Sequence, residues 1–340
     1  MRRRIIIATL GMATGFWVGA AEKQNPGEPG EAQGSRYPQA EFQNQFLKAT
    51  LYLPDAQRGY YRGTRFDWAG LISRVEYDRH SFFCEFKQEH DPFNHDDICG
   101  TAEEFDIDSP PPGFVEAKPG DPFMKIGVGV LERPDAREYA FWKMYKIRTP
   151  GTWKIERSAD KIAFQQNLQG PNGWAYDYTK TLEAPAGSTT LRITRRLKNT
   201  GTQAIKTDHY GHNFSRIDNL PAGTNYTLDF RFTPLLAPDS QAKGCVAVKG
   251  QSLIFTTNPP PDVAIWVRLE GFQKPEDNEI RMVNHKTGAA MTITSDQPLV
   301  KLVFYSSGGV LCPEPFVRLV IPPGVTREWT TTYRFAAEKQ

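Results

Sequence analysis

Residues 189–201 read TTLRITRRLKNTG, and their apolar side chains recur with a period of two. Leu191, Ile193 and Leu197 fall on one face of an extended chain, and the residues between them are polar. A Lys-Asn-Thr-Gly turn signal at 198–201 closes the segment. This pattern is typical of a half-buried antiparallel strand that packs one face on a core.

Similar segments recur outward from this strand, with short turns between them. No window longer than about 12 residues keeps a helical period, and no repeat of about 20–50 residues is present. Aromatic residues make up 12% of the 340 residues, which also favours strands. We therefore predict an all-β fold, an antiparallel sandwich or barrel, as one domain over residues 42–337. The further predicted strands are 204–214, 226–232, 263–269, 279–283, 289–294 and 299–305, with a hairpin connection at 284–288.

The N-terminus has the layout of a secretory signal peptide over residues 1–21. Three arginines at 2–4 precede a short apolar run, and small residues follow at 19–21. The run is shorter than the about 20 residues of a typical transmembrane helix, and the alternative is that this segment is retained as an N-terminal membrane anchor. Residues 22–41 are rich in Gly, Pro, Glu and Gln and predict a flexible linker. We expect a periplasmic or secreted protein that has no membrane contact after cleavage.

The charge balance of the mature chain excludes one class of partner. Removing the leader takes three of the 41 Lys and Arg residues and leaves 38 basic against 39 acidic side chains, a net charge of −1. A nearly neutral chain argues against binding to a phosphate backbone, so we expect no nucleic-acid partner.

The four cysteines, Cys84, Cys99, Cys245 and Cys312, show no CxxC motif and no histidine at zinc-ligand spacing. We therefore expect no metal site at these residues. An oxidising compartment permits one or two disulfides, with Cys84–Cys99 the most local pairing. Free buried thiols are the alternative.

Two histidines lie at the end of the predicted strand 204–214. His209 and His212 are three residues apart, so an extended chain places their rings on opposite faces. One ring is then able to line a groove while the other supports packing. Far along the chain, Glu314 lies between Pro313 and Pro315, which stiffen the backbone around it. A carboxylate held in this way suits a general base, and an ordinary exposed loop residue is the alternative.

Three stretches in the second half of the chain resemble the aldose 1-epimerase (galactose mutarotase) family. Asn199-Thr200-Gly201, a strand and His212-Asn213-Phe214 are similar to the family's Asn turn and its His-x-Tyr-Phe strand end. The Leu311-Cys312-Pro313-Glu314 segment resembles the family's Cys-Leu-Glu. Residues 322–335 resemble its closing Pro-Gly turn and last strand. The matches cover about residues 190–335 in family order.

The resemblance implies a supersandwich of two large antiparallel sheets with a sugar in an open groove. It implies that His212 is the acid and Glu314 the base of a ring-opening reaction that interconverts sugar anomers. Such a reaction needs one proton donor and one acceptor, and we expect neither metal nor cofactor. We predict that the two groups share one groove, on opposite sides of a pyranose ring.

The first half of the chain departs from the family pattern. The family's Leu-His-Gly-Gly stretch is absent, and His95 is the candidate for its second histidine. Arg65 is the candidate for an arginine that hydrogen-bonds to a sugar hydroxyl. His209, with Arg65 and His95, is a candidate substrate-binding residue. The acidic group Asp96, Asp97, Glu103 and Glu104 predicts a solvated loop, with sugar contacts or a calcium site as the alternatives.

These observations favour an exported aldose 1-epimerase-like isomerase that acts on a monosaccharide or glycan. The alternative is a carbohydrate-binding module, or a lyase-like enzyme acting on polysaccharide, built on the same sandwich.

Overall fold

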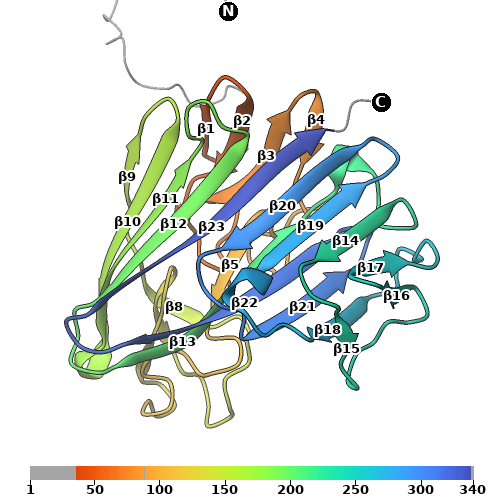
Figure 1. Cartoon of the computed structure of the whole chain (residues 1–340). Coiled ribbons are helices and arrows are strands. Elements are labelled where there is room, and N and C mark those ends of the chain that lie inside the picture. Colours follow the sequence, from red (N-terminus) through yellow and green to blue (C-terminus); the bar gives the residue numbers. More distant parts are fainter. Residues whose placement is uncertain (1–35, 88, 338–340) are drawn as a thin grey trace, which may run out of the picture.

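The computed structural model describes residues 36–87 and 89–337. Within these residues the chain forms strands and no α-helix, and all paired strands are antiparallel. Figure 1 shows a ten-stranded sheet in front of a six-stranded sheet whose strands cross behind it. Three one-turn 3₁₀ helices complete the described elements, namely η1 (Pro171–Gly173), η2 (Ile217–Asn219) and η3 (Pro275–Asp277).

The four sheets have the following strand orders. The ten-stranded sheet is β16 (Val246–Lys249), β17 (Ser252–Phe255), β14 (Tyr226–Phe230), β19 (Glu279–Asn284), β20 (Ala289–Ser295), β23 (Thr326–Ala337), β12 (Thr190–Asn199), β11 (Ala175–Glu183), β10 (Lys161–Gln169) and β9 (Lys154–Arg157). The six-stranded sheet is β15 (Leu235–Leu236), β18 (Ile265–Glu270), β21 (Lys301–Ser306), β22 (Cys312–Ile321), β13 (Ile205–Phe214) and β5 (Gly100–Phe105). The smaller sheets are β1 (Gln39–Gln43), β2 (Leu47–Tyr52), β3 (Leu71–Tyr77) and β4 (His80–Phe82), and β6 (Pro122–Lys125), β7 (Gly129–Glu132) and β8 (Lys146–Pro150).

The main core lies between the two large sheets. Ile193 of β12 and Phe304 of β21 are fully buried in one cluster that draws on both sheets. The rings of Phe255 and Phe304 meet across the gap with centroids 6.0 Å apart. Burying each such side chain contributes about 1.5–3 kcal/mol, so the period-two pattern of the strands accounts for the sandwich.

The strands predicted from the second half of the chain are confirmed, including the hairpin between β19 and β20. The first strand begins at Gln39, inside the stretch that was predicted as linker. The predicted signal peptide and residues 22–35 lie outside the described residues. None of the helical turns within the described chain has the length and hydropathy to cross a bilayer. All four cysteines are buried and free, so the local Cys84–Cys99 pairing is not formed.

The outer face of the six-stranded sheet is covered by long connections from the first half of the chain. Arg65 and Phe66, between β2 and β3, reach β13, where Arg65 bonds to Tyr210 and the Phe66 ring lies 6.0 Å from the His212 ring. The candidate site is built between this sheet face and these connections.

Candidate active site

Strand β13 carries two different environments on its two faces. His209 points toward the ten-stranded sheet, where its Nδ1 accepts a hydrogen bond from Trp329 Nε1 at 3.2 Å. His212 points to the outer face, against Phe66. The opposite orientation of the two rings follows from the alternation of side chains along an extended chain.

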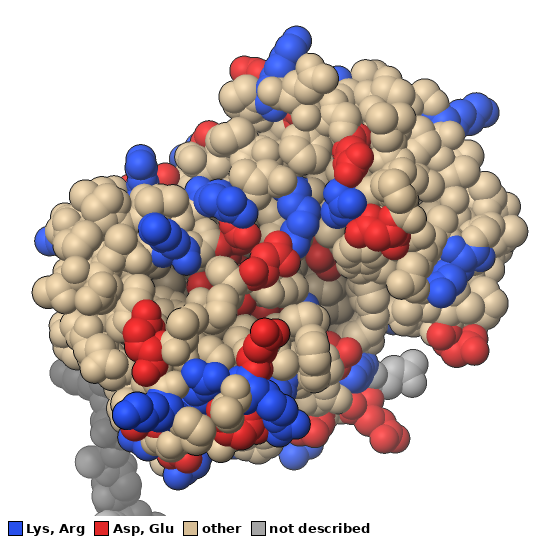
Figure 2. All heavy atoms as spheres, turned by 90° about the horizontal axis from the view of Figure 1, so that it is seen from below, with Lys and Arg blue, Asp and Glu red and all other residues tan. Residues whose placement is uncertain are grey.

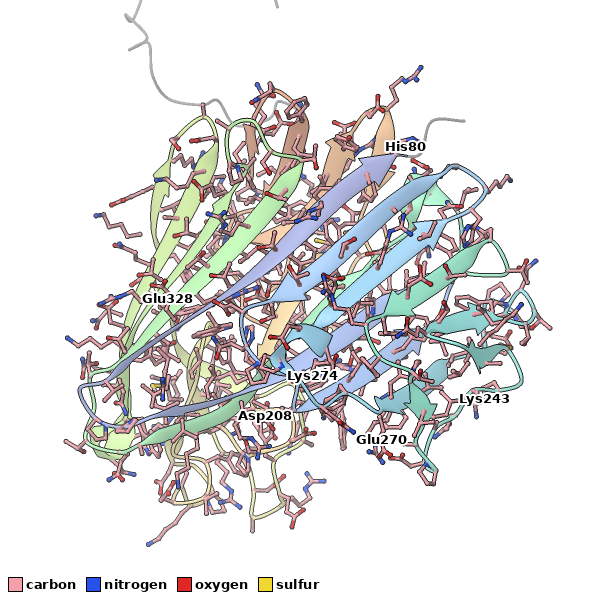
Figure 3. All side chains as sticks on the ribbon, viewed as in Figure 1. His80, Asp208, Lys243, Glu270, Lys274 and Glu328 are labelled. Atoms are coloured by element: carbon pink, nitrogen blue, oxygen red, sulfur yellow. The ribbon has the colours of Figure 1, made fainter. Side chains whose placement is uncertain are left out.

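His212 lies beside Glu314 because their strands are neighbours. Along β13 and β22, Asp208 faces Arg318 and Tyr210 faces Phe316 on the outer side of the sheet. Asp208, in the lower part of β13 in Figure 3, accepts a hydrogen bond from Arg318 Nε at 2.8 Å. The next outward pair is His212 and Glu314, and His212 Nε2 lies 3.1 Å from Glu314 Oε1.

This direct contact corrects the predicted placement on opposite sides of a sugar ring. Neighbouring positions on paired strands hold their Cβ atoms only about 4.5–5.5 Å apart, so no pyranose fits between the two groups. The side chains of His212 and Glu314 are also 7% and 8% exposed, so a ligand reaches only their outer edges.

The pair is held in place by its neighbours. The Phe214 ring stacks on the His212 ring at 4.1 Å, and the Tyr305 ring meets it edge-on at 5.5 Å. Asn213 Nδ2 donates to the Pro313 carbonyl at 2.7 Å, which ties β13 to β22 beside Glu314. The imidazole Nδ1 is buried and has no hydrogen-bond partner.

Burial sets the protonation of the pair. Loss of solvent raises the pKa of Glu314 to about 8, and it lowers the pKa of His212 well below its ordinary value. The charge of Arg65 lowers the His212 pKa further. Near neutral pH the pair therefore holds one transferable proton, and burial favours that proton on the carboxyl group.

Arg65 is fixed by a buried polar cluster on the same face. Its Nε donates to Glu104 Oε2 at 2.8 Å, and its terminal nitrogen donates to the Tyr210 hydroxyl at 2.9 Å. The guanidinium lies 4.4 Å from the centroid of the Phe66 ring and 4.5 Å from that of Phe141. Two rings and a carboxylate thus hold a cation close enough to act on the pKa of His212.

His95 lies near this cluster on a partly exposed loop. Its ring meets the Phe141 ring edge-on with centroids 6.5 Å apart, and partial burial lowers its pKa. Arg65 and His95 therefore share a neighbour, and Arg65 acts electrostatically on both histidines. Seen from below, the molecule is hollowed, with acidic side chains inside the hollow and basic ones along its rim (Figure 2).

His209 takes no part in this outer cluster. Its Nε2 lies 3.2 Å from Glu103 Oε2, between the sheets, and burial lowers its pKa to about 4. Glu103 also binds Lys180 Nζ at 3.1 Å and both of its oxygens accept from Arg195 Nε at 3.1 Å. A sugar at His212 would lie on the opposite side of the sheet, so the structure separates His209 from the other predicted substrate-binding residues.

The predicted solvated acidic loop is wrong for most of its members. Asp97, Glu103 and Glu104 are completely buried, because each has cationic or histidine partners inside the protein. Asp96 alone is partly exposed and pairs with Lys87 at 2.7 Å. No group of three or more His, Cys, Asp or Glu side chains in the described chain is arranged to hold a metal ion.

The sequence analysis missed Tyr210 and Phe66, and it named Glu104 only as one of a group of acidic residues. Glu104 and Tyr210 face each other across β5 and β13, and Phe66 packs on both Arg65 and His212. A signal for Arg195 was available, because it alternates in phase with the buried Leu191, Ile193 and Leu197 of β12. Glu103 and Glu104 gave no comparable signal, since their partners come from distant segments.

The antiparallel β-sandwich has the galactose mutarotase-like fold. Similar solved structures include the Slr1438 protein from Synechocystis sp. PCC 6803, with 12% identity over 89% of this chain and 97% of that one, at a TM-score of 0.55. A galactose mutarotase-like protein from Lactobacillus casei has 11% identity over 88% and 100% of the chains and a TM-score of 0.53. A putative aldose 1-epimerase from Escherichia coli K12 has 12% identity over 88% and 98% and a TM-score of 0.51.

No family model matches the sequence, and no curated protein matches it. At 11–12% identity the structural similarities establish the fold alone. The resemblance that the sequence motifs indicated is confirmed at that level, as is the large antiparallel β-sandwich.

Proposed function

We propose that the protein is an exported aldose 1-epimerase-like isomerase that interconverts sugar anomers by opening and closing the ring. The observation that carries this proposal is the contact between His212 and Glu314 at 3.1 Å on the outer face of the sandwich. Arg65 and His95 nearby supply donors for sugar hydroxyls, as the family resemblance implies. A monosaccharide or the end of a glycan is the proposed partner.

The reaction needs two proton transfers, one at each of the two oxygens bonded to C1. The C1 hydroxyl oxygen and the ring oxygen are both bonded to C1, so an acid and a base that lie side by side reach both. One group takes the hydroxyl proton while the other gives a proton to the ring oxygen, and the bond from C1 to the ring oxygen breaks. After rotation of the carbonyl group, the ring closes on its other face with the transfers reversed.

The single proton shared by His212 and Glu314 is what these steps of ring opening and closing require. With the proton on Glu314, that carboxyl group is the acid and neutral His212 is the base, which reverses the roles implied by the resemblance. With the proton on His212, the implied roles hold. Both forms carry one proton, and burial favours the first form. Positioned proton transfer contributes about 10²–10⁴-fold for each partner.

A second candidate function is carbohydrate binding without isomerisation, or lyase-like action on a polysaccharide. It is favoured by the burial of the pair, since only a small edge of each group meets a ligand. The two candidates differ in whether a freshly dissolved anomer equilibrates faster with the protein than without it.

The test is polarimetry or NMR on freshly dissolved α-glucose and α-galactose. We expect the purified protein to accelerate equilibration, and we expect Glu314→Gln and His212→Ala each to reduce the acceleration by about 10²–10⁴-fold. The matched control is Glu132→Gln, which changes an outer carboxylate that pairs with Lys146 and Arg148 on the small β6–β7–β8 sheet. Equilibration of neither sugar above the buffer rate would refute the isomerase and favour the binding function.

A further inference from the structure

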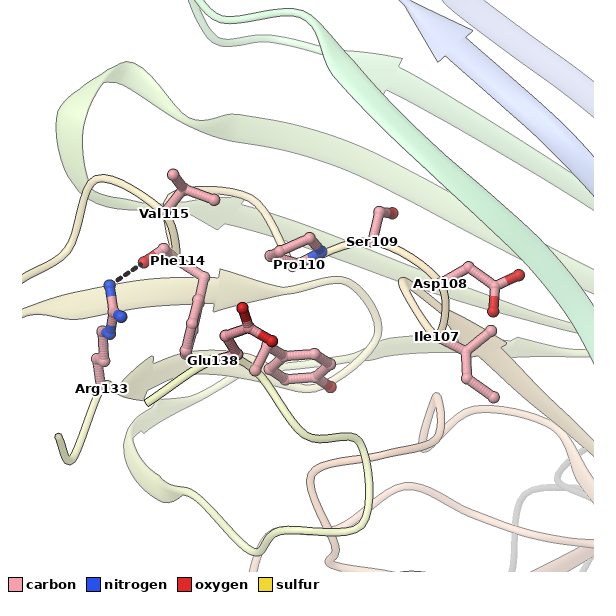
Figure 4. Close-up of a pocket in the computed structure, with 9 residues that line it drawn as sticks. Ile107, Asp108, Ser109, Pro110, Phe114, Val115, Arg133 and Glu138 are labelled. Atoms are coloured by element: carbon pink, nitrogen blue, oxygen red, sulfur yellow. Dashed lines mark hydrogen bonds between the residues drawn. The ribbon is translucent and has the colours of Figure 1, made fainter. Parts of the chain in front are cut away.

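A separate cavity of about 410 Å³ lies beside the candidate site. Figure 4 shows its walls, which come from the connection between β5 and β6 and from the connection between β7 and β8. The residues on which the argument depends are Asp108, Ser109, Phe114, Arg133, Glu138 and Tyr139.

Two segments connect this cavity to the His212–Glu314 pair. Tyr139 lines the cavity, and Phe141, at most about 7 Å further along the chain, packs on Arg65 in the candidate site. Asp108 lines the cavity and pairs with Lys301, whose Nζ lies 3.8 Å from the centroid of the Phe316 ring. Both paths run along the same outer face of the six-stranded sheet.

The sheet face itself is continuous between the two places. The Phe316 ring stacks on the Tyr210 ring at 4.2 Å, and Tyr210 lies two residues before His212 on the same side of β13. Tyr210 and Phe316 are themselves buried, so a ligand that extends from the pair toward the cavity would pass over the partly exposed Phe141 and Lys301 that pack around them.

The polar atoms of the cavity suit hydroxyl groups. Ser109 Oγ and the Tyr139 hydroxyl are buried and have no hydrogen-bond partner, so each has unused capacity to donate and accept. The aromatic rings of Phe114 and Tyr139 form apolar wall beside them. Alternating hydroxyl contacts and apolar wall match a sugar ring, which has hydroxyls at its edge and C–H groups on its faces.

The charges of the cavity favour a neutral ligand. The Arg133 nitrogens donate to five backbone carbonyls, those of Phe114, Ala117, Asp135, Ala136 and Arg137. This guanidinium therefore has no N–H left for a phosphate or carboxylate ligand. Asp108 is paired with Lys301, and Glu138 and Arg133 carry opposite charges in the same wall, so the wall has no excess positive charge to attract a uronate or a sugar phosphate.

A rim for a longer ligand is also present. Trp142 is 61% exposed, and its ring meets the Phe141 ring edge-on at 5.0 Å. It follows Tyr139 and Phe141 on the same loop, so a large exposed ring stands at the edge of the connected site and cavity.

We propose that this cavity is a second sugar subsite, and that the protein takes the reducing end of a neutral oligosaccharide. This inference rests on the proposed function. The reducing unit places its C1 oxygens at His212 and Glu314, and the adjoining unit occupies the cavity with hydroxyls on Ser109 and Tyr139.

The test compares binding and turnover of glucose with those of maltose, cellobiose and lactose. Isothermal titration calorimetry on the Glu314→Gln protein gives the dissociation constants, and equilibration of fresh anomers by the unchanged protein gives kcat/KM. We expect at least one disaccharide to bind about tenfold or more tightly than glucose. The double variant Ser109→Ala, Tyr139→Phe loses about five- to tenfold of that affinity, while its kcat/KM for glucose is unchanged. Digalacturonate, an anionic disaccharide, is expected to bind more weakly than the neutral sugars.

The outcomes separate this proposal from the proposed function. Glucose equilibration together with equal affinities for glucose and all three disaccharides overturns the subsite and leaves the isomerase. Disaccharide binding that depends on Ser109 and Tyr139, without any equilibration, supports the subsite and refutes the isomerase. Tight digalacturonate binding overturns the neutral-ligand inference. Circular dichroism of the double variant, which keeps the Tyr139 ring, checks that the fold is retained.

Discussion

Replacing Glu103 by Gln is the sharpest test of how the two large sheets are held together. The carboxylate binds Arg195, Lys180 and His209, and these side chains are almost completely buried. In Glu103→Gln, Arg195 loses its ion partner, and Lys180 keeps Asp67, at 3.4 Å, as an ion partner and the Ala69 carbonyl, at 2.7 Å, as an acceptor. Breaking a buried ion pair costs about 3–5 kcal/mol. At about 2 °C per kcal/mol for a domain of this size, the midpoint of thermal unfolding should fall by about 6–10 °C.

The assay is thermal unfolding followed by circular dichroism at pH 7. Glu132→Gln is again the matched control, because it removes an outer carboxylate from ion pairs on β7 and should leave the midpoint unchanged. The Arg195 and Lys180 charges hold the pKa of Glu103 well below its ordinary value, so its stabilisation is present at neutral pH and is lost as the pH falls. A midpoint within 2 °C of the unchanged protein at pH 7 would refute the reasoning.

Three further predictions follow from the site and the termini. Isomerase activity should fall as the pH rises through about 8, because Glu314 then loses the one proton that the pair shares. The activity should persist well below pH 6.5, because the pKa of His212 is lowered and the imidazole stays neutral there. An activity that rises above pH 8 would contradict this prediction. Tyr210→Phe should lower kcat/KM by about tenfold in steady-state kinetics, because Arg65 loses the hydrogen bond to the Tyr210 hydroxyl. Mass spectrometry of the protein expressed in a bacterial host should find an N-terminus near Ala21, and an intact Met1 would count against export.

The fold was within reach of sequence reasoning because its signal is local. The alternation in β12 and the turn after it define a half-buried strand without knowledge of its partners. The same period placed His209 and His212 on opposite faces, as the structure has them. The length of chain between β13 and β22 did not prevent His212 and Glu314 from being assigned to one site, because family motifs marked both strands.

The rest of the site depends on partners that only the folded chain brings together. Glu103 and Glu104 are neighbours in sequence, yet β5 directs one between the sheets to Arg195 and the other outward to Arg65. Without those partners, four acidic residues in a polar stretch look like a solvated loop. The spacing between His212 and Glu314 was also misjudged, since it follows from strand pairing rather than from the size of a sugar.

Strand β13 holds a buried ion cluster on one face and the His212–Glu314 pair on the other, and this limits which changes in chain length the protein tolerates. Inserting or deleting one residue between Asp208 and His209 would turn the outer imidazole toward the charged interior and move the inner one outward. Length changes are therefore expected to concentrate in the covering connections, while the His212–Glu314 pair keeps its place. A lineage of such proteins would diversify its ligands by remodelling loops around an unchanging stretch of ten residues, Ile205–Phe214.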